Sequence, residues 1–291
     1  MLSPGTGTER PRILILGSGD RRPGILTQID RLRPVIEEYA EIAGEDLHFD
    51  SRHDVTAMSV DFAIVLGGDG SILRAAHLLE HHQIPVLGVN LGRLGFLADI
   101  QPDELANALH RLRQGEFRLV DHLMLRCSVF RGNNLLHDRL GLNECAILAG
   151  PPFSMQYIDL YVDGELATSY SGDGLLISTP VGSTAHNLSA GGPILRKDLM
   201  AFVLTPINPH TLTVRPVVDT AERVFELVLR QPGDSASVVL DGQVLTALQS
   251  TDRVRVERAK AVFQLIEIKG QGYYRTLREK LGWRGDMGKS G

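Results

Sequence analysis

The stretch FAIVL-GGDGS-ILRAAHLL, residues 62–79, decides the fold of this chain. Residues 62–66 are apolar throughout and too few for a typical helix, as expected for a strand covered on both faces. Residues 72–79 have the composition of a helix, and the turn between the two segments is rich in glycine. Successive glycines let backbone amides approach an anion at the positive end of a helix dipole. The stretch therefore predicts a strand, a phosphate-binding turn and a helix.

An acidic residue lies inside this glycine turn. We assign phosphate binding to Gly67, Gly68, Gly70 and Ser71, and we expect Ser71 to be the helix N-cap. Asp69 differs from these residues, because a carboxylate repels phosphate unless it holds Mg²⁺ or takes a proton from a nucleophile. The alternative is a plain tight turn, in which glycine supplies positive φ and Asp69 caps the helix.

A second stretch, GDG-LLIST-PVGSTAHNLSAGGP, covers residues 172–193. Residues 175–179 indicate a strand, and residues 180–193 are dense in Gly, Ser and Thr. Such a segment is long for a plain connection, since most loops have about 4 to 6 residues and longer ones are usually functional or disordered. Apolar strands flank this one, so we predict a functional loop.

The composition of the chain limits the classes of protein to which it can belong. The chain has 291 residues, of which 43% are hydrophobic and 22% charged, and its formal net charge is -5. This charge does not favour nucleic acid or anionic membrane as a partner. Residues 1–12 do not resemble a signal peptide, and we expect a cytoplasmic protein. Cys127 and Cys145 match no metal spacing, and we predict buried thiols rather than a disulfide.

The pattern of elements changes near residue 120. Before it, short apolar runs at residues 13–16, 62–66 and 86–89 alternate with helical spacing, which is the signature of a doubly wound α/β domain. After it, many short β-branched runs are separated by hairpin signals at Gly132, Gly164 and Gly242. The predicted fold class is therefore α/β plus all-β: an N-terminal doubly wound domain and a C-terminal, mostly antiparallel β domain.

Six further segments accompany the two loops. They are residues 90–97 (NLGRLGFL), 142–144 (LNE), 209–212 (PHTL), 215–216 (RP), 241–243 (DGQ) and 274–283 (YRTLREKLGW). Together these segments resemble the signature pattern of the NAD kinase family, in order, over nearly the whole chain. The first loop alone also resembles diacylglycerol kinases, sphingolipid kinases and phosphofructokinases.

The resemblance implies a domain arrangement. We expect an α/β domain at residues 1–120, completed by the C-terminal segment 273–291, which would dock back on it. Residues 121–272 would form the β-rich, NAD-binding domain, and the ligand cleft would lie between the two domains. Members of the family are homo-oligomers, so we expect a homodimer or a homotetramer.

The reaction implied is transfer of the terminal phosphoryl group of ATP, or of another donor, to the 2′-hydroxyl of the adenosine ribose of NAD, giving NADP. The cofactor implied is Mg²⁺ or another divalent cation with ATP, and no residue is assigned as a protein metal ligand. Asp69 would be catalytic, orienting the 2′-hydroxyl and accepting its proton. Arg74 lies about one helical turn into the helix and would meet a phosphate near the mouth of the loop.

The family pattern also assigns substrate contacts. Asn143 and Glu144 would hydrogen-bond the dinucleotide, Asp173 would lie near the nicotinamide-side ribose, and Phe96 would offer a ring for stacking. The complete set of expected substrate contacts is Asp69, Gly70, Arg74, Phe96, Asn143, Glu144, Asp173, Thr184, Ala185, His186, Asn187, Leu188, Ser189 and Gln243.

One of these positions departs from the family pattern. His186 stands where the family usually has tyrosine, and a histidine ring changes its charge near neutral pH. We therefore expect NAD binding to weaken below about pH 6.5. The measurement is NAD affinity from about pH 5.5 to 8 in the wild type and in His186→Tyr; identical curves would eliminate the idea.

Two alternatives from other classes remain at this point. A lipid kinase would share only the first loop and would leave residues 173–193 unexplained. A non-catalytic nucleotide-binding regulator would keep the ligand site without turnover, although the retained Asp69 speaks against it.

Overall fold

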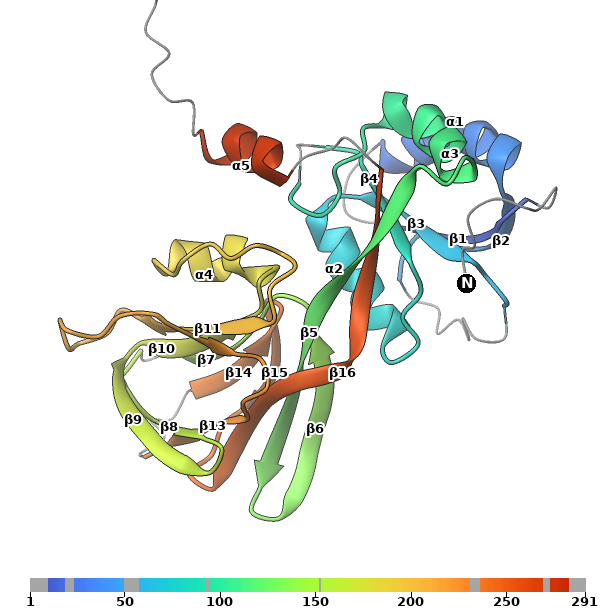
Figure 1. Cartoon of the computed structure of the whole chain (residues 1–291). Coiled ribbons are helices and arrows are strands. Elements are labelled where there is room, and N and C mark those ends of the chain that lie inside the picture. Colours follow the sequence, from blue (N-terminus) through green and yellow to red (C-terminus); the bar gives the residue numbers. More distant parts are fainter. Residues whose placement is uncertain are drawn as a thin grey trace, which may run out of the picture. The chain divides into compact units, whose positions relative to one another are not determined.

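The computed structural model describes residues 10–18, 24–49, 58–92, 95–151, 153–230, 236–268 and 273–282. The chain forms two compact units, shown in Figure 1. The first contains Met1–Val120 and Gln264–Gly291, and the second contains Asp121–Phe263. The sequence analysis placed residues 264–272 in the second domain. In the structure the last residues of the final strand belong to the first unit, because Leu265 pairs there with Val86.

The first unit is an α/β layer structure. Its described elements are β1 (Arg12–Gly17), α1 (Ile25–Tyr39), β2 (Glu41–Asp46), β3 (Phe62–Gly67), α2 (Asp69–Leu79), β4 (Val86–Asn90), a 3₁₀ turn (Pro102–Glu104), α3 (Leu105–Arg113) and α5 (Tyr273–Leu281). The beginning of β5 (Phe117–Arg131) and the end of β16 (Asp252–Ile268) complete it.

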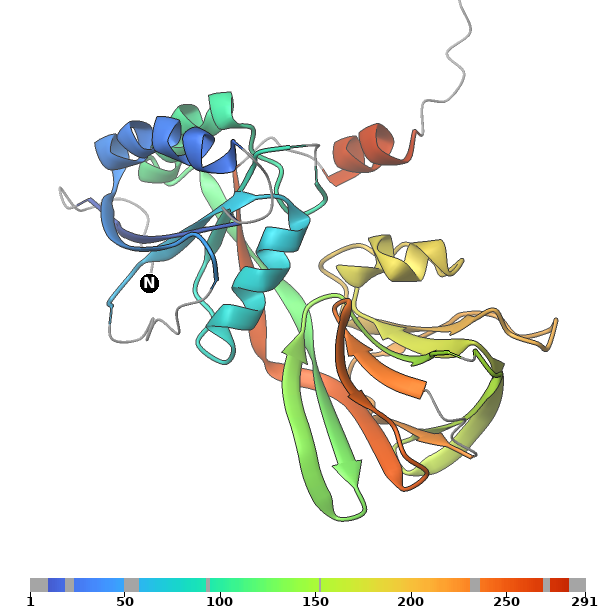
Figure 2. The ribbon, with the colours of Figure 1, turned by 180° about the vertical axis from the view of Figure 1, so that it is seen from behind.

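The strands of this unit pair in parallel in the order β2-β1-β3-β4, and the end of β16 follows β4. Strands β3 and β4 are buried at every residue, so the expectation of strands covered on both faces is confirmed. Helices α1 and α3 share one hydrophobic core with the sheet, while α2 buries Ile72, Ala75 and Leu79 elsewhere. Figure 2 shows α1 and α3 over one face and α2 over the other.

Strand β2 was not predicted from the sequence. Its residues, EIAGED, lack the alternation of apolar and polar side chains, and only Asp46 is fully buried. This strand lies at the edge of the sheet and pairs with β1 alone. Its formation therefore depends on backbone pairing more than on side-chain burial.

The second unit consists of antiparallel strands. They are β6 (Asn134–Gly141), β7 (Glu144–Ala149), β8 (Gln156–Val162), β9 (Glu165–Gly172), β10 (Gly174–Ser178), β11 (Ala201–Ile207), β12 (Val217–Thr220), β13 (Phe225–Leu229), β14 (Ala236–Leu240) and β15 (Gln243–Ala247), with most of β5 and β16. A 3₁₀ turn (Gly182–Thr184) and the short helix α4 (His186–Ser189) interrupt them.

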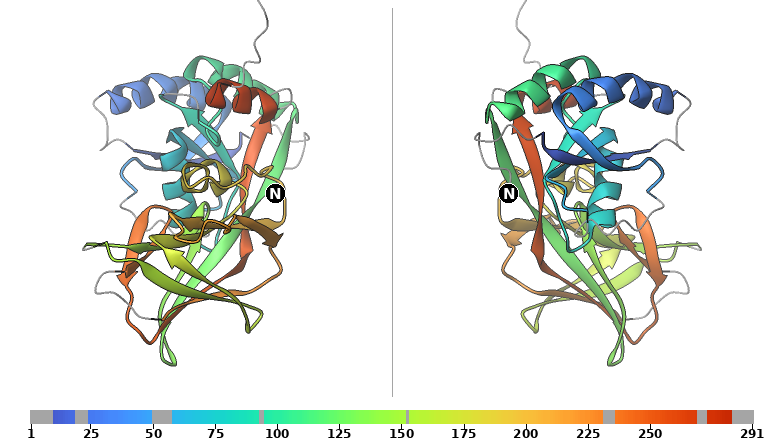
Figure 3. Two further views of the ribbon diagram at one scale, coloured as in Figure 1. Left: turned by 90° about the vertical axis from the view of Figure 1, so that its left-hand side faces the viewer. Right: turned by 90° about the vertical axis from the view of Figure 1, so that its right-hand side faces the viewer.

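Six strands form a sheet in the order β12-β11-β10-β7-β14-β15, and every pairing in it is antiparallel. The long strands β5 and β16, green and orange-red in Figure 3, run side by side. The three predicted hairpin turns are present, with positive φ at Gly132, Gly164 and Gly242. The predicted fold class, a mixed α/β domain with an antiparallel β domain, is confirmed.

The core of this unit contains both cysteines. Cys127 on β5 and Cys145 on β7 are free and fully buried, as predicted, and their Sγ atoms lie 3.5 Å apart. The hydrogen bond to Cys127 and burial raise the pKa of the Cys145 thiol. Phe202 packs edge to face on Phe225 in the same core, with ring centroids 5.9 Å apart.

No helix among the described residues is long and apolar enough to cross a membrane.

Candidate active site

The glycine turn joins β3 to α2, but the helix begins earlier than predicted. It begins at Asp69, and Gly68 precedes it in an extended conformation. The Gly68 carbonyl accepts hydrogen bonds from Ser71 N at 2.8 Å and Ile72 N at 3.2 Å. The prediction that Ser71 is the N-cap is therefore wrong, because Ser71 lies in the first helical turn with its side chain buried.

The glycines of this turn let other groups come close to the backbone. They are not required by an unusual backbone conformation. None of the three glycines in the turn has a positive φ, so the plain tight-turn alternative does not explain them. A Cβ atom at Gly67 would overlap the Ser71 side chain, while Gly68 and Gly70 face open space. Open backbone at the beginning of a helix is what a phosphate-binding turn requires.

Asp69 is bound to the backbone of a neighbouring segment. Its Oδ2 accepts from Phe96 N at 2.8 Å, and its Oδ1 accepts from Leu97 N at 2.9 Å and Ala98 N at 3.1 Å. Gly95 approaches so closely that a Cβ atom there would overlap Oδ1 of Asp69. The carboxylate is thus fixed in position. A carboxylate has about four acceptor sites, and the described residues fill three of those of Asp69, which leaves one for a ligand.

A cavity of about 620 Å³ adjoins the turn. Asp69, Gly70 and Arg74 line it, together with Ser18 and Lys280, which the sequence analysis did not assign. Ser18 follows β1 and is buried, with its Oγ 2.8 Å from Oγ of Ser71. The sequence signal for Ser18 was the run GSGD at residues 17–20, a second glycine-rich segment after a strand.

Arg74 occupies the wall of this cavity. Its Nη2 donates to the His48 carbonyl at 2.8 Å, its Nη1 lies 3.5 Å from Oγ of Ser18, and its guanidinium stacks 4.4 Å from the centroid of Phe49. The expected position near the loop is therefore found, but much of the guanidinium is engaged with protein groups.

In the second unit, Asn143 and Glu144 lie at the beginning of β7 and are held by Asp241. Oδ2 of Asp241 accepts from Leu142 N at 2.7 Å, and its Oδ1 accepts from Asn143 N at 2.8 Å and Glu144 N at 2.9 Å. Asp241 has a φ of 47° in the turn between β14 and β15. The sequence analysis treated Asp241 as a turn residue, and its positioning role was missed.

Glu144 is a buried acid. Oε2 of Glu144 has no hydrogen-bond partner among the described residues. Burial, with a smaller contribution from Asp241, raises the pKa of Glu144 from 4.5 to about 8. A buried polar atom without a partner is costly, so this carboxyl is suited to complete its hydrogen bonding with a ligand.

This pKa gives a prediction for stability. Between pH 4.5 and about 8 the unfolded chain binds fewer protons at Glu144 than the folded one, so the free energy of unfolding falls as pH rises. We expect Glu144→Gln to remove this fall and to stabilise the protein by about 5 kcal/mol at pH 9, because each unit of pKa shift corresponds to about 1.4 kcal/mol. Urea unfolding at pH 5, 7 and 9 measures it, with the exposed Glu165→Gln as control. Parallel curves for the wild type and Glu144→Gln would contradict it.

The predicted functional loop is ordered by internal hydrogen bonds. Asn187 is fully buried, and its Nδ2 donates to Ser183 O at 3.1 Å and to Pro193 O at 2.9 Å. Its Oδ1 accepts from Oγ1 of Thr205 at 2.6 Å. These bonds favour a positioning role for Asn187 over the direct substrate contact that the sequence analysis expected.

The other residues of this loop differ in exposure. Thr184, Ala185, His186 and Leu188 are half-buried, and Ser189 is exposed. These side chains have surface available to a ligand, as the predicted lining of adenine and ribose requires.

The two remaining predicted contacts are exposed. Asp173 precedes β10 and accepts from Nδ2 of Asn208 at 2.8 Å. Gln243 is the first residue of β15, directly after the Asp241 turn. The predicted site residues thus form two groups: Asp69, its loop, Arg74 and Phe96 in the first unit, and all others in the second.

The fold and these two groups of residues define a class of protein. In this class, one chain contains an α/β unit with a phosphate-binding loop and an antiparallel β unit with polar groups at the ends of its strands. Residues 33–117 match the family model described as ATP-NAD kinase N-terminal domain, and residues 142–268 match ATP-NAD kinase C-terminal domain.

Proteins with similar sequences support the same family assignment as these two models. An NAD kinase of Rhodopirellula baltica is 51% identical over 277 residues, which are 95% of this chain and 88% of that protein. An NAD kinase of Geotalea daltonii is 38% identical, covering 81% and 83% of the two chains. The chain belongs to the NAD kinase family. The lipid kinase alternative is thereby set aside.

Solved structures share the fold. The NAD kinase from Archaeoglobus fulgidus in complex with ATP has a TM-score of 0.72 and 27% identity, covering 94% of this chain and all of that one. Yeast NADH kinase complexed with NADH has a TM-score of 0.82 over 98% of this chain and 91% of that one, at 20% identity.

Proposed function

We propose that this protein phosphorylates NAD at the 2′-hydroxyl of its adenosine ribose, with ATP as donor, to give NADP. The observation that carries the proposal is the placement of a fixed carboxylate, Asp69, beside a cavity next to glycine backbone at the beginning of α2. The Archaeoglobus relative was solved with ATP, which supports ATP as the donor.

In the proposed reaction, the 2′-oxygen of NAD forms a bond to the γ-phosphorus of ATP. The bond between that phosphorus and the β,γ-bridging oxygen breaks, and ADP leaves. Asp69 orients the hydroxyl and accepts its proton, while the amides at the beginning of α2 stabilise the charge on the phosphoryl group. The enzyme contributes mostly positioning, because such transition states are loose and highly charged.

The described residues fit a divalent cation that arrives with the donor. They contain no group of three or more metal-ligating side chains, and Mg²⁺ is usually bound by one or two carboxylates plus substrate phosphates. Among the described residues that line the cavity, Asp69 is the carboxylate that could meet such a cation. The cation would neutralise charge on the phosphates.

We assign NAD binding to the second unit. The unpartnered Oε2 of Glu144, the neighbouring Asn143 and the half-buried His186 support this assignment. The ligand cleft predicted between the domains stays a prediction.

Self-association and location are part of the same proposal. The two edge strands of the six-stranded sheet expose apolar side chains, at Val217 and Val218 on β12 and at Val244 on β15. Exposed apolar edges support association with a second copy. We propose a cytoplasmic homodimer or homotetramer.

The test is NADP formation from NAD with Mg²⁺-ATP, with ADP followed in the same samples. Stoichiometric NADP and ADP are expected. A folded protein that binds NAD but makes no NADP with ATP, other nucleotides or polyphosphate would support the non-catalytic regulator instead.

A further inference from the structure

Lys280 lies on α5 and lines the same cavity as Asp69 and Arg74. The sequence analysis gave it no role. Its Nζ lies 5.5 Å from the centroid of the Phe96 ring, and Phe96 donates its backbone N–H to Asp69. The hydrogen bond from Phe96 N to Asp69 therefore also fixes the backbone that carries the ring next to Lys280.

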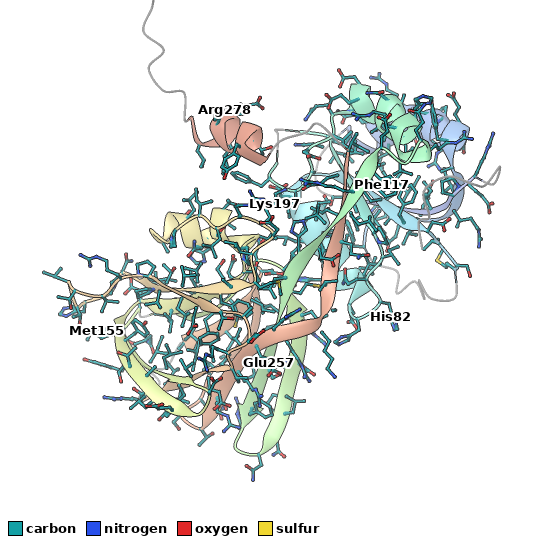
Figure 4. All side chains as sticks on the ribbon, viewed as in Figure 1. His82, Phe117, Met155, Lys197, Glu257 and Arg278 are labelled. Carbon is teal, nitrogen blue, oxygen red and sulfur yellow. The ribbon has the colours of Figure 1, made fainter. Side chains whose placement is uncertain are left out.

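The packing of α5 explains this position. Leu277 is buried, with 3% of its surface exposed, and it anchors the helix. Lys280 follows three positions later, so its side chain projects from the same face as Leu277. Arg278, labelled on α5 in Figure 4, is exposed and is not part of the cavity lining.

Among the described residues, Arg74 and Lys280 are the cations that line the cavity, and they differ in how they are bound. Arg74 is held by the His48 carbonyl and the Phe49 ring. Lys280 is exposed, and no carboxylate pairs with it within the part of the chain that the structure describes. A contact between an exposed ammonium and a ring is weak, so the ammonium can leave it for a stronger partner. Its three N–H donors would then be available to an anion.

We infer that Lys280 binds the triphosphate of the phosphoryl donor in this cavity. The inference rests on the proposed function for the name of the donor. The chain carries a net charge of -5, so a triphosphate needs local cations rather than general attraction. Lys280, the amides of the glycine turn and the half-buried Arg74 supply positive charge around one space. Lysine is a frequent phosphate ligand that acts as a point charge.

The experiment compares three variants. Lys280→Met keeps the approximate length of the side chain but removes its charge, Lys280→Arg keeps the charge, and Arg278→Met is the matched control. Calorimetry with inorganic tripolyphosphate and Mg²⁺ measures phosphate binding without turnover. Steady-state rates give KM for ATP, and equilibrium binding gives Kd for NAD.

We expect Lys280→Met to weaken tripolyphosphate binding and to raise the KM for ATP by about 10- to 100-fold, as for loss of a charge-assisted contact. NAD affinity should not change, Lys280→Arg should stay within about threefold of the wild type, and Arg278→Met should match it.

Equal tripolyphosphate affinity in Lys280→Met and Arg278→Met would overturn the inference. It would also be overturned if Lys280→Met weakened NAD binding alone, since Lys280 would then contact the dinucleotide. If the wild type bound tripolyphosphate through Lys280 but made no NADP, the phosphate site would stand and the proposed kinase activity would fail.

Discussion

Asp69→Asn is expected to lower the rate of NADP formation by at least about a hundredfold, a range typical of removing a general base. Asparagine has the same size, but one acceptor oxygen becomes an NH₂ group. That group would face backbone N–H donors, because both oxygens of Asp69 accept hydrogen bonds from the segment at residues 96–98. The variant therefore loses a proton acceptor and at least one of the bonds that fix the loop. Initial rates at saturating NAD and Mg²⁺-ATP measure the effect.

A second variant separates the loss of the proton acceptor from the loss of the bonds that fix its position. Gly95→Ala keeps the carboxylate but places a methyl group where Oδ1 of Asp69 lies, so the carboxylate must move. We expect this variant also to lose most of its activity while retaining NAD affinity, since small displacements of a reacting group are costly. Asp69→Asn with the activity of the wild type would show that Asp69 neither orients the hydroxyl nor accepts its proton.

The sequence predicted the layers of the first unit because its strands are apolar at every position and its turns are rich in glycine. It did not predict β2, whose residues carry no periodic pattern. It also placed the start of α2 three residues late, because Ser is a frequent N-cap and the extended Gly68 cannot be recognised from its identity.

The candidate site was predicted in part, for a physical reason. Family pattern and glycine content located Asp69, Asn143 and Glu144. The groups that hold these residues in place could not be located from the sequence. The amides that bind Asp69 are 27 to 29 residues away from it, and the amides of residues 142–144 are 97 to 99 residues away from Asp241, which binds them. Local patterns carry no signal for such contacts. Lys280 was missed for the same reason, since an exposed lysine on an amphipathic helix is ordinarily a solvated side chain.

The two units share one device, a carboxylate that binds three successive backbone amides. Asp69 binds residues 96–98 and Asp241 binds residues 142–144. In each case the bound segment carries a predicted substrate contact, Phe96 or Asn143. Successive amides directed at one carboxylate define the path of the backbone, so each aspartate sets where the next side chains project.

Asp241→Asn is therefore expected to weaken NAD binding by at least about tenfold and to destabilise the protein by about 1 to 3 kcal/mol for each lost acceptor. Asparagine tolerates the positive φ of this position, so the turn itself is kept. The variant also removes a negative charge that helps to raise the pKa of Glu144, and this pKa should fall below about 8. NAD titration and urea unfolding between pH 5 and 9 measure the three effects.

Asp163→Asn is the matched control, because Asp163 occupies the same place in the turn between β8 and β9, with a φ of 51°. Its carboxylate binds Val224 N and Arg223, away from the residues assigned to NAD. We expect this control to leave NAD affinity and the pH dependence of stability unchanged. If both variants lowered NAD affinity equally, the effect of Asp241 would be general loss of structure. If Asp241→Asn bound NAD like the wild type, the amides of residues 142–144 would not need this carboxylate to hold Asn143 and Glu144 in place.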